Sequence, residues 1–289
     1  MIVEFLSLIA AFCYTLSGLL AVFGMKNSNP TTATLISMTA NVLILWPITF
    51  LYSAIVFDNS ALLLYALSAA FAPVTGRLLN YAGMERVGVS TSTSILGLQP
   101  IMVAILASVF FSERLPLVIY LAIVITVIGV VIIGRSHSSP SDNKPFRLWE
   151  LILPFSATFC YSSSNIVRKE GLKIQNLPLL AASATCSFSL LYLGATLLVT
   201  NKRKEIVTTR SSTTLFALSG LVNSLAWITS FQALNIGEAS IVSTVLGIQP
   251  LIAIVLSYVF LKKTEIITIQ KAIGALLIVL GVFAITILQ

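Results

Sequence analysis

The chain has 289 residues, of which 57% are hydrophobic and only 9% are charged, and its mean hydropathy is +0.99. Soluble domains carry about 25% charged residues. This composition excludes a soluble enzyme, a nucleic-acid-binding protein and a disordered chain. The net charge of +7 does not indicate a polyanion partner, because Lys and Arg in a membrane protein mainly mark the loops that stay in the cytoplasm.

Apolar segments long enough to cross a bilayer follow one another along the whole chain. A bilayer core of roughly 30 Å needs about 20 mainly apolar helical residues. Ten such segments are bounded by charged residues, Pro or Gly, and they cover approximately residues 2–24, 31–56, 61–83, 88–111, 116–134, 148–168, 178–200, 212–234, 239–261 and 266–288. The sequence therefore predicts an all-α polytopic membrane protein with ten transmembrane helices.

Three smaller features fit this organisation. The first apolar segment has no Lys or Arg before it and is longer than a signal-peptide core, so we expect it to be a retained span. The cysteines Cys13, Cys160 and Cys186 lie in apolar segments and are expected to pack as small apolar side chains. Residues 135–147 form a polar linker, whose His137 is expected to be solvated.

The two halves of the chain repeat one another in three blocks. AAFCYTLS at 10–17 returns as ATFCYSSS at 157–164, and TSILGLQP at 93–100 returns as STVLGIQP at 243–250. Glu113 with Gly129-Val130 returns as Glu265 with Gly281-Val282. The predicted units are residues 1–134 and 148–289, joined by the linker. Since each holds five spans, the second must enter the membrane from the opposite side, which is typical of secondary transporters built from inverted repeats.

The distribution of positive charge predicts the orientation. Eleven Lys and Arg residues lie on the side reached by the ends of the odd-numbered spans, and four lie on the other side. The first side is therefore expected to be cytoplasmic. This predicts a multi-pass protein of the cell membrane with both termini outside the cytoplasm.

The duplicated blocks resemble the paired EamA repeats of the drug/metabolite transporter superfamily. The resemblance rests on the small-residue start, the LG-x-QP helix and the later acidic residue before a helix with a GV pair, and it covers nearly the whole chain. It implies ten helices, alternating access, a small solute, and a central cavity lined by the first, third and fourth helices of each repeat. Members carry amino acids, sugars, phosphorylated metabolites and drugs, so the resemblance does not select a solute.

Two features depart from many relatives. The loop after the second span, which is basic in many of them, is here the acidic segment 56–59, and the predicted termini lie outside rather than inside. Small multidrug members have a mid-membrane Glu in their first helix, whereas this chain has only Glu4 near the end of that span. Proton coupling through a buried carboxylate is therefore the least expected mechanism.

Arg77 is the most informative candidate for substrate binding. An arginine inside a span costs roughly 2.5 to 3.5 kcal/mol on insertion scales, so it should face a cavity or a partner. Asn80 and Tyr81 share its helical face at i+3 and i+4. A guanidinium can bind a carboxylate or phosphate through two oxygens. The alternative is that Arg77 extends to the cytoplasmic surface beside Glu85.

The second repeat has an aromatic residue, Trp227, at the position that corresponds to Arg77, and its face also carries Asn223, Ser230 and Phe231. Arg77 and Trp227 together could bind the two ends of an amphipathic solute. The alternative is a tryptophan that only packs between helices.

The sixth span adds further candidates on one helical face, since Tyr161, Asn165 and Arg168 lie at i, i+4 and i+7. Tyr14 is the matching tyrosine of the first span. Tyr14, Tyr161 and Asn165 are expected to line the cavity, with hydrogen bonding between helices as the alternative. Arg168 is expected to be an anchor at the membrane interface.

The Gln-Pro pairs of the fourth and ninth spans predict local distortion. Proline cannot donate to the carbonyl four residues earlier, so these helices are expected to kink. The preceding glycines allow another helix to approach closely. We interpret Gly97, Pro100, Gly247 and Pro250 as a hinge, with a static kink as the alternative. Gln99, Gln249 and Ser92 are further candidate cavity residues.

The sequence contains no signature of a metalloprotease, a nucleotide-binding loop or an intramembrane protease, so no catalytic residue, metal site or cofactor is expected. The expected function is secondary transport or exchange of a small polar metabolite, with an amino acid or organic anion favoured by Arg77. The alternative is a membrane scaffold of the same fold that transports nothing. The expected partners are the solute and the lipid bilayer but no nucleic acid, and a homodimer is left open.

Overall fold

The computed structural model describes residues 2–111, 147–200, 205–237, 239–260 and 268–287, together with a few positions between 121 and 132. The predicted fifth span at 116–134 lies largely outside these ranges. Most of the linker with His137, the acidic residues Glu113 and Glu265, and the basic residues at 202–204 and 262–263 lie outside them as well. Nothing but helices and their connections is found in the described part.

The remaining nine predicted spans correspond to helices with closely similar limits. In the first half these are α1 (Ile2–Met25), α2 (Pro30–Tyr52), the continuous run of α3 (Asn59–Ala69), η1 (Ala70–Gly76) and α4 (Arg77–Val87), and the pair α5 (Val89–Leu96) and α6 (Gln99–Phe111). In the second half they are η2 (Leu148–Leu151) with α8 (Ile152–Ile174), α9 (Pro178–Val199), α10 (Arg210–Ile236), the pair α11 (Ala239–Leu246) and α12 (Gln249–Phe260), and α13 (Ile269–Ile287).

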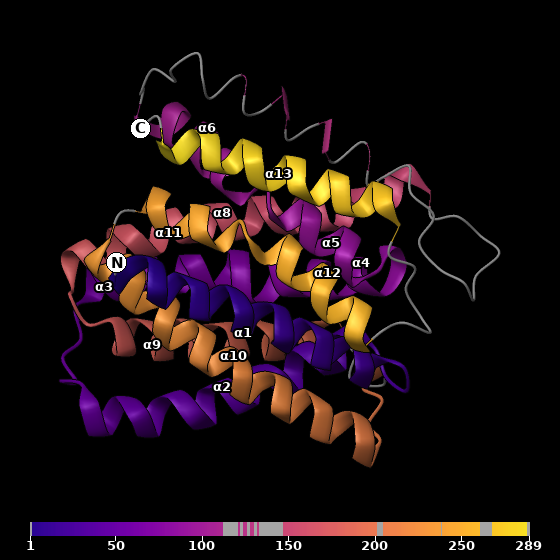
Figure 1. The fold of residues 1–289 in the computed structure, drawn as a ribbon. Helices are drawn as coiled ribbons and strands as arrows, with labels where there is room; N and C mark the ends of the chain where they lie inside the picture. The colour runs from indigo at the N-terminus through magenta and orange to yellow at the C-terminus, as the bar shows by residue number, and fades with distance from the viewer. Residues whose placement is uncertain are drawn as a thin grey trace.

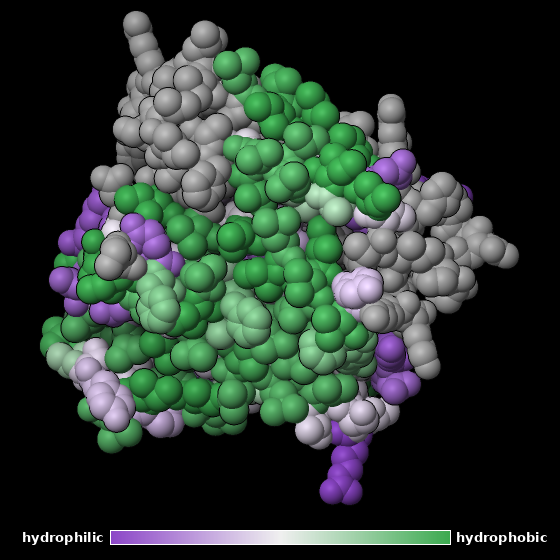
Figure 2. Space-filling view, in the orientation of Figure 1, coloured by the Kyte–Doolittle hydropathy of each residue, from purple (hydrophilic) through white to green (hydrophobic). Residues whose placement is uncertain are grey.

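The surface has the pattern of a protein that crosses a bilayer. Five helical runs among the described residues are long and apolar enough to span one: α1, α2, 59–87, α9 and α10. The helices run along a common direction, and both ends of the chain lie on the same side (Figure 1). A broad apolar band covers the middle of the visible face, and hydrophilic residues gather at its two edges (Figure 2). The chain is an all-α polytopic membrane protein, as predicted.

Side-chain caps determine where several helices begin. Asn29 precedes α2 and accepts a hydrogen bond from the Thr32 amide at 2.9 Å. Asp58 caps α3 in the same way through the Ala61 amide at 2.9 Å. Each cap satisfies a backbone N–H that has no partner within the helix, which contributes about 1 kcal/mol.

The two halves pack against each other through equivalent helices. α1 packs against α10, and α8 packs against α3 and η1, so the first helix of each half contacts the third span of the other. A hydrogen bond between two serines is found at both crossings. Ser17 and Ser219 are joined by a 2.9 Å hydrogen bond between their hydroxyls, and the hydroxyl of Ser164 donates to that of Ser68 at 3.1 Å. Ser17 and Ser164 are equivalent positions of the first repeated block, as expected for repeats related by a two-fold axis.

A glycine allows α10 to approach α2 closely. A Cβ atom on Gly220 would lie 2.6 Å from the Cβ of Ala40 and 2.7 Å from the backbone oxygen of Ser37. Neither atom belongs to the movable end of a flexible side chain. Small residues at helix crossings of this kind supply the van der Waals contacts that hold membrane helices together.

The two Gln-Pro spans are broken rather than gently bent. α5 ends at Leu96 and α6 begins at Gln99, while α11 ends at Leu246 and α12 begins at Gln249. The broken helices pack against each other, α5 on α12 and α6 on α11. A Cβ on Gly97 would lie 2.9 Å from Cγ of Pro250 and 2.8 Å from Cγ2 of Ile278. The predicted close approach at Gly97 is therefore present, and its neighbour is the opposite repeat's proline.

We predict that Gly220→Ala lowers the stability of the purified protein by about 1–3 kcal/mol, because the added methyl group forces α2 and α10 apart. Thermal or denaturant unfolding in detergent measures the change. Gly194→Ala is the matched control, since a Cβ on Gly194 would meet no atom within 4 Å. Equal stability of the two variants would contradict the close packing of α2 and α10.

Candidate functional site

A cavity of about 80 Å³ lies between the two halves of the bundle. Its walls come from the first, third and fourth spans of the first repeat and from the equivalent spans of the second, as the resemblance implied. The lining residues are Tyr14, Thr15, Ser17, Gly18, Pro73, Arg77, Asn80, Tyr81, Met84, Thr93, Leu96, Gln99, Tyr161, Asn165, Arg168, Asn223, Trp227, Ser230, Leu246 and Gln249.

The local structure before Arg77 is a π-helical segment, η1, that contains Pro73. Proline has no N–H to donate to the carbonyl four residues earlier, so the regular ladder is interrupted there. The amide of Arg77 bonds to the carbonyl of Ala72, five residues earlier. Insertions of this kind often accompany functional sites. Pro73 itself lines the cavity, so the distortion and the arginine lie together.

Arg77 is directed into the protein and not towards the surface. Only 4% of it is exposed. Its Nη2 donates to Oδ1 of Asn223 at 2.6 Å, and its Nη1 donates to Oγ of Ser37 at 3.4 Å. Glu85 forms no ion pair with it. The structure thus excludes the alternative in which Arg77 extends to the cytoplasmic surface.

Arg168 was expected to be an anchor at the membrane interface, and this expectation was wrong. Only 3% of Arg168 is exposed, and it lines the cavity. Its Nε donates to Oγ of Ser68 at 3.2 Å, and its Nη1 donates to Oδ1 of Asn165 at 3.4 Å. The sequence placed Arg168 on the same helical face as Tyr161 and Asn165. The face assignment was right, and only the depth of the arginine was misjudged.

An aromatic pair covers one side of Arg168. Trp227 stacks on Phe231 with ring centroids 5.3 Å apart. The guanidinium carbon of Arg168 lies 4.6 Å from the centroid of the Trp227 ring and 5.2 Å from that of Phe231. Trp227 therefore packs between helices and lines the cavity at once. Stacking on an aromatic face stabilises a guanidinium where water is excluded.

The other predicted residues fall into two groups. Those that line the cavity are Tyr14, Asn80, Tyr81, Gln99, Tyr161, Asn165, Asn223 and Gln249. Ser92 does not line it. The Ser92 hydroxyl is fully buried and donates to Oδ1 of Asn80 at 3.1 Å, so it orients a lining residue from behind.

Both helix breaks border the cavity. Leu96 and Gln99 line it on either side of the first break, and Leu246 and Gln249 do so at the second. Two hydroxyls of α8 bond to backbone oxygens at the first break: Thr158 donates to the carbonyl of Ile95 at 3.2 Å and Ser162 to that of Gln99 at 3.4 Å. Irregular backbone is stable inside a membrane only where such partners or a cavity are present.

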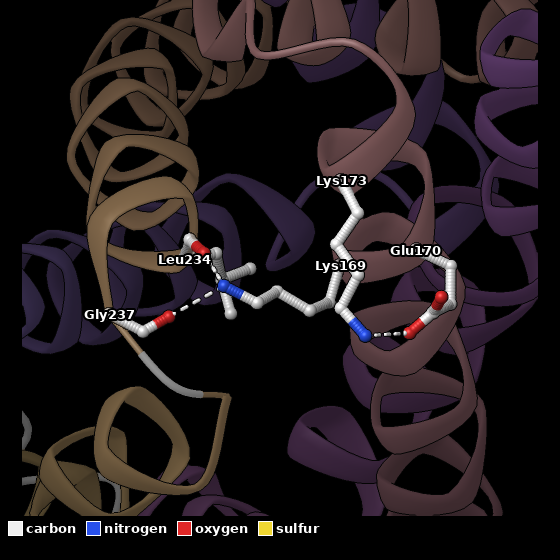
Figure 3. A network of polar contacts seen from close by, with 5 residues as sticks. All are labelled: Lys169, Glu170, Lys173, Leu234 and Gly237. Carbon is white, nitrogen blue, oxygen red and sulfur yellow. Dashed lines mark hydrogen bonds and ion pairs between the residues drawn. The ribbon is translucent and has the colours of Figure 1, made fainter.

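A lysine next to the site joins α8 to α10. Nζ of Lys169 donates to the carbonyl oxygens of Leu234 and Gly237, at 2.7 and 2.8 Å (Figure 3). These carbonyls lie at the C-terminal end of α10, where cations are favoured. Lys173 instead pairs with Glu170 of its own helix at 2.6 Å, on the exposed side. Lys169 thus holds α8 and α10 together beyond the aromatic pair.

The charged residues that the structure describes on the cavity wall are all positive. They are two arginines, and no aspartate or glutamate is found among the described lining residues. Two ion pairs between described residues, Arg86 with Glu150 and Lys173 with Glu170, involve neither arginine. A small anion would therefore complement this cavity.

Several lining residues were not proposed from the sequence, namely Thr15, Ser17, Gly18, Pro73, Met84, Thr93, Leu96, Arg168, Ser230 and Leu246. Some signals were present. Thr15, Ser17 and Gly18 follow Tyr14 on α1, and Ser230 shares the face of Trp227. Met84 and the leucines carry no such signal, because apolar side chains look alike whether they face lipid, a helix or a cavity.

Comparison with known proteins identifies the family. The family model described as the EamA-like transporter family matches residues 1–135 and 148–287. The chain belongs to the EamA-like transporter family. A protein of known crystal structure superposes with a TM-score of 0.71 over 99% of this chain and 96% of that chain, at 12% identity. At this identity the likeness shows a shared fold.

We predict that Arg77 and Asn223 are energetically coupled in this EamA-like transporter. Asn223→Leu leaves a buried guanidinium with one acceptor fewer, which costs about 1–3 kcal/mol. In the background of Arg77→Met the same substitution should cost much less. A double-mutant cycle on thermal stability measures the coupling. Additive effects of the two substitutions would contradict the contact.

Proposed function

We propose that the protein is a secondary transporter or exchanger that moves a small polar metabolite, an amino acid or organic anion, by alternating access. The observation that carries this proposal is the buried Arg77 on a cavity wall whose described residues include no carboxylate. A guanidinium binds carboxylate and phosphate oxygens in pairs. The volume of the cavity suits a small solute.

The two broken helices supply an element that can change shape. Gly97 and Pro100 in one repeat, and Gly247 and Pro250 in the other, flank or follow the breaks that border the cavity. Few backbone hydrogen bonds have to be broken for the half-helices to tilt at these positions. In the proposal they act as hinges while one repeat rocks against the other around the solute.

The proposed location is the cell membrane with both termini outside the cytoplasm. Its support is the excess of Lys and Arg on the loops at the ends of the odd-numbered spans. Figure 1 places both termini on one side of the molecule, as an even number of spans requires. A scaffold of the same fold that transports nothing is the competing function, and it gives no role to a cationic cavity.

A flux assay separates the transporter from the scaffold. The purified protein is reconstituted into liposomes, and the uptake of labelled amino acids and organic anions is measured against empty vesicles. At least one solute should enter faster in the presence of the protein. The absence of flux across a broad panel, in both directions of gradient, would favour the scaffold.

Arg77→Gln should lower the uptake of an anionic solute at least about tenfold, because a charge-assisted pair is removed. Uptake of a neutral solute should change much less. Arg210→Gln is the matched control, since Arg210 is exposed at the start of α10. Equal loss for both solutes would show that Arg77 stabilises the fold and does not recognise charge.

A cysteine added after Gln289 should react with a membrane-impermeant thiol reagent in intact cells. The native Cys13, Cys160 and Cys186 are buried and give little background. Labelling only after the cells are opened would reverse the proposed orientation.

A further inference from the structure

Two buried arginines, one from each repeat, line the same cavity. Arg77 begins α4, and Arg168 lies in α8. Each is held by the opposite repeat, because Arg77 donates to Asn223 of α10 and Arg168 donates to Ser68 of α3. The arrangement places two fixed positive charges around one small space.

Most of the hydrogen-bonding capacity of these guanidinium groups is not used by the described residues. A guanidinium has five N–H donors. Arg77 bonds to Ser37 and Asn223, and Arg168 bonds to Ser68 and Asn165. Trp227 covers the flat face of Arg168, but the N–H bonds lie in the guanidinium plane and stay available. Each group can therefore donate to a further anionic oxygen at its edge.

The described residues around the pair do not compensate its charge. The acceptors of both arginines are neutral amides and hydroxyls, and no lining residue in the described part of the chain is acidic. Two like charges near each other in a medium of low permittivity repel one another. A bound solute with one negative charge would compensate only half of this charge, and a solute with two would compensate all of it.

We infer that the solute is a dianion, with one anionic group bound by Arg77 and the other by Arg168. This inference rests on the proposed transport function and narrows its substrate class. Dicarboxylates and phosphate monoesters share the required chemistry, which is two negative charges on a small molecule. Tyr14, Tyr161 and Asn80 supply hydroxyl and amide groups for the part of the solute between the charges.

The experiment compares solutes that differ by one charge and little else. Binding to the purified wild-type protein is measured by calorimetry or thermal stabilisation, since a ligand of the folded state raises its apparent stability. The dicarboxylates from malonate to adipate are each paired with their monoamide. Glycerol 3-phosphate is paired with its methyl diester, which separates phosphate monoesters from dicarboxylates.

At least one dianion should bind roughly tenfold or more tightly than its singly charged partner, because a second charge-assisted contact is formed. Arg168→Gln should remove this difference while leaving the binding of the monoanion nearly unchanged. Arg168→Lys should recover part of it, since the charge returns without the paired geometry. Arg210→Gln should behave as the wild type.

Three results decide the matter. A dianion preference that disappears in Arg168→Gln supports the inference. Equal binding of every dianion and its singly charged partner overturns it and leaves the proposed transport of an amino acid or organic anion intact. Failure of all these anions to bind, together with no anion flux in liposomes, overturns both. Should Arg168→Gln not fold, Ser68→Ala, which removes an acceptor that orients Arg168, must weaken the preference for the dianion.

Discussion

The arrangement of the bundle depends on keeping two guanidinium groups inside an apolar protein. An isolated charge in such surroundings costs several kcal/mol unless it is hydrogen-bonded. Neutral groups meet part of this cost, and for each arginine one of them comes from the opposite repeat: Asn223 accepts from Arg77, and Ser68 accepts from Arg168. The repeats must therefore pack against each other for either arginine to be buried, and the cavity forms where these contacts meet.

Small polar residues join the two repeats where their helices cross. Ser17 bonds to Ser219 where α1 crosses α10, and Ser164 bonds to Ser68 where α8 crosses α3. Such hydrogen bonds contribute about 1 kcal/mol each within a membrane. The hydroxyl of Ser68 takes part in the α8–α3 crossing and also accepts a hydrogen bond from Arg168. Packing of the helices and orientation of the cavity arginine are therefore linked through one hydroxyl.

The helix limits, the broken helices and the polar helical faces could be predicted from the sequence. The limits of α1, α9 and α13 lie within a few residues of the predicted spans, because about 20 apolar residues have no stable alternative in a bilayer. The Gln-Pro pairs indicated the broken helices, since proline removes a donor at a known position. The helical faces of Arg77 and Tyr161 were also correct, because side-chain direction follows the period of the helix.

By itself the sequence determined the spans, the duplication, the broken helices and the faces that carry polar residues, since all of these depend on local periodicity. Only the tertiary structure decided which polar faces meet. Arg168 looked like an interfacial anchor because charge near the end of a span is usually solvated, yet α3 and α10 enclose it. Ser92 looked like a cavity residue and lies behind Asn80. Depth and partners depend on helices far apart in the chain, and helical periodicity carries no information about them.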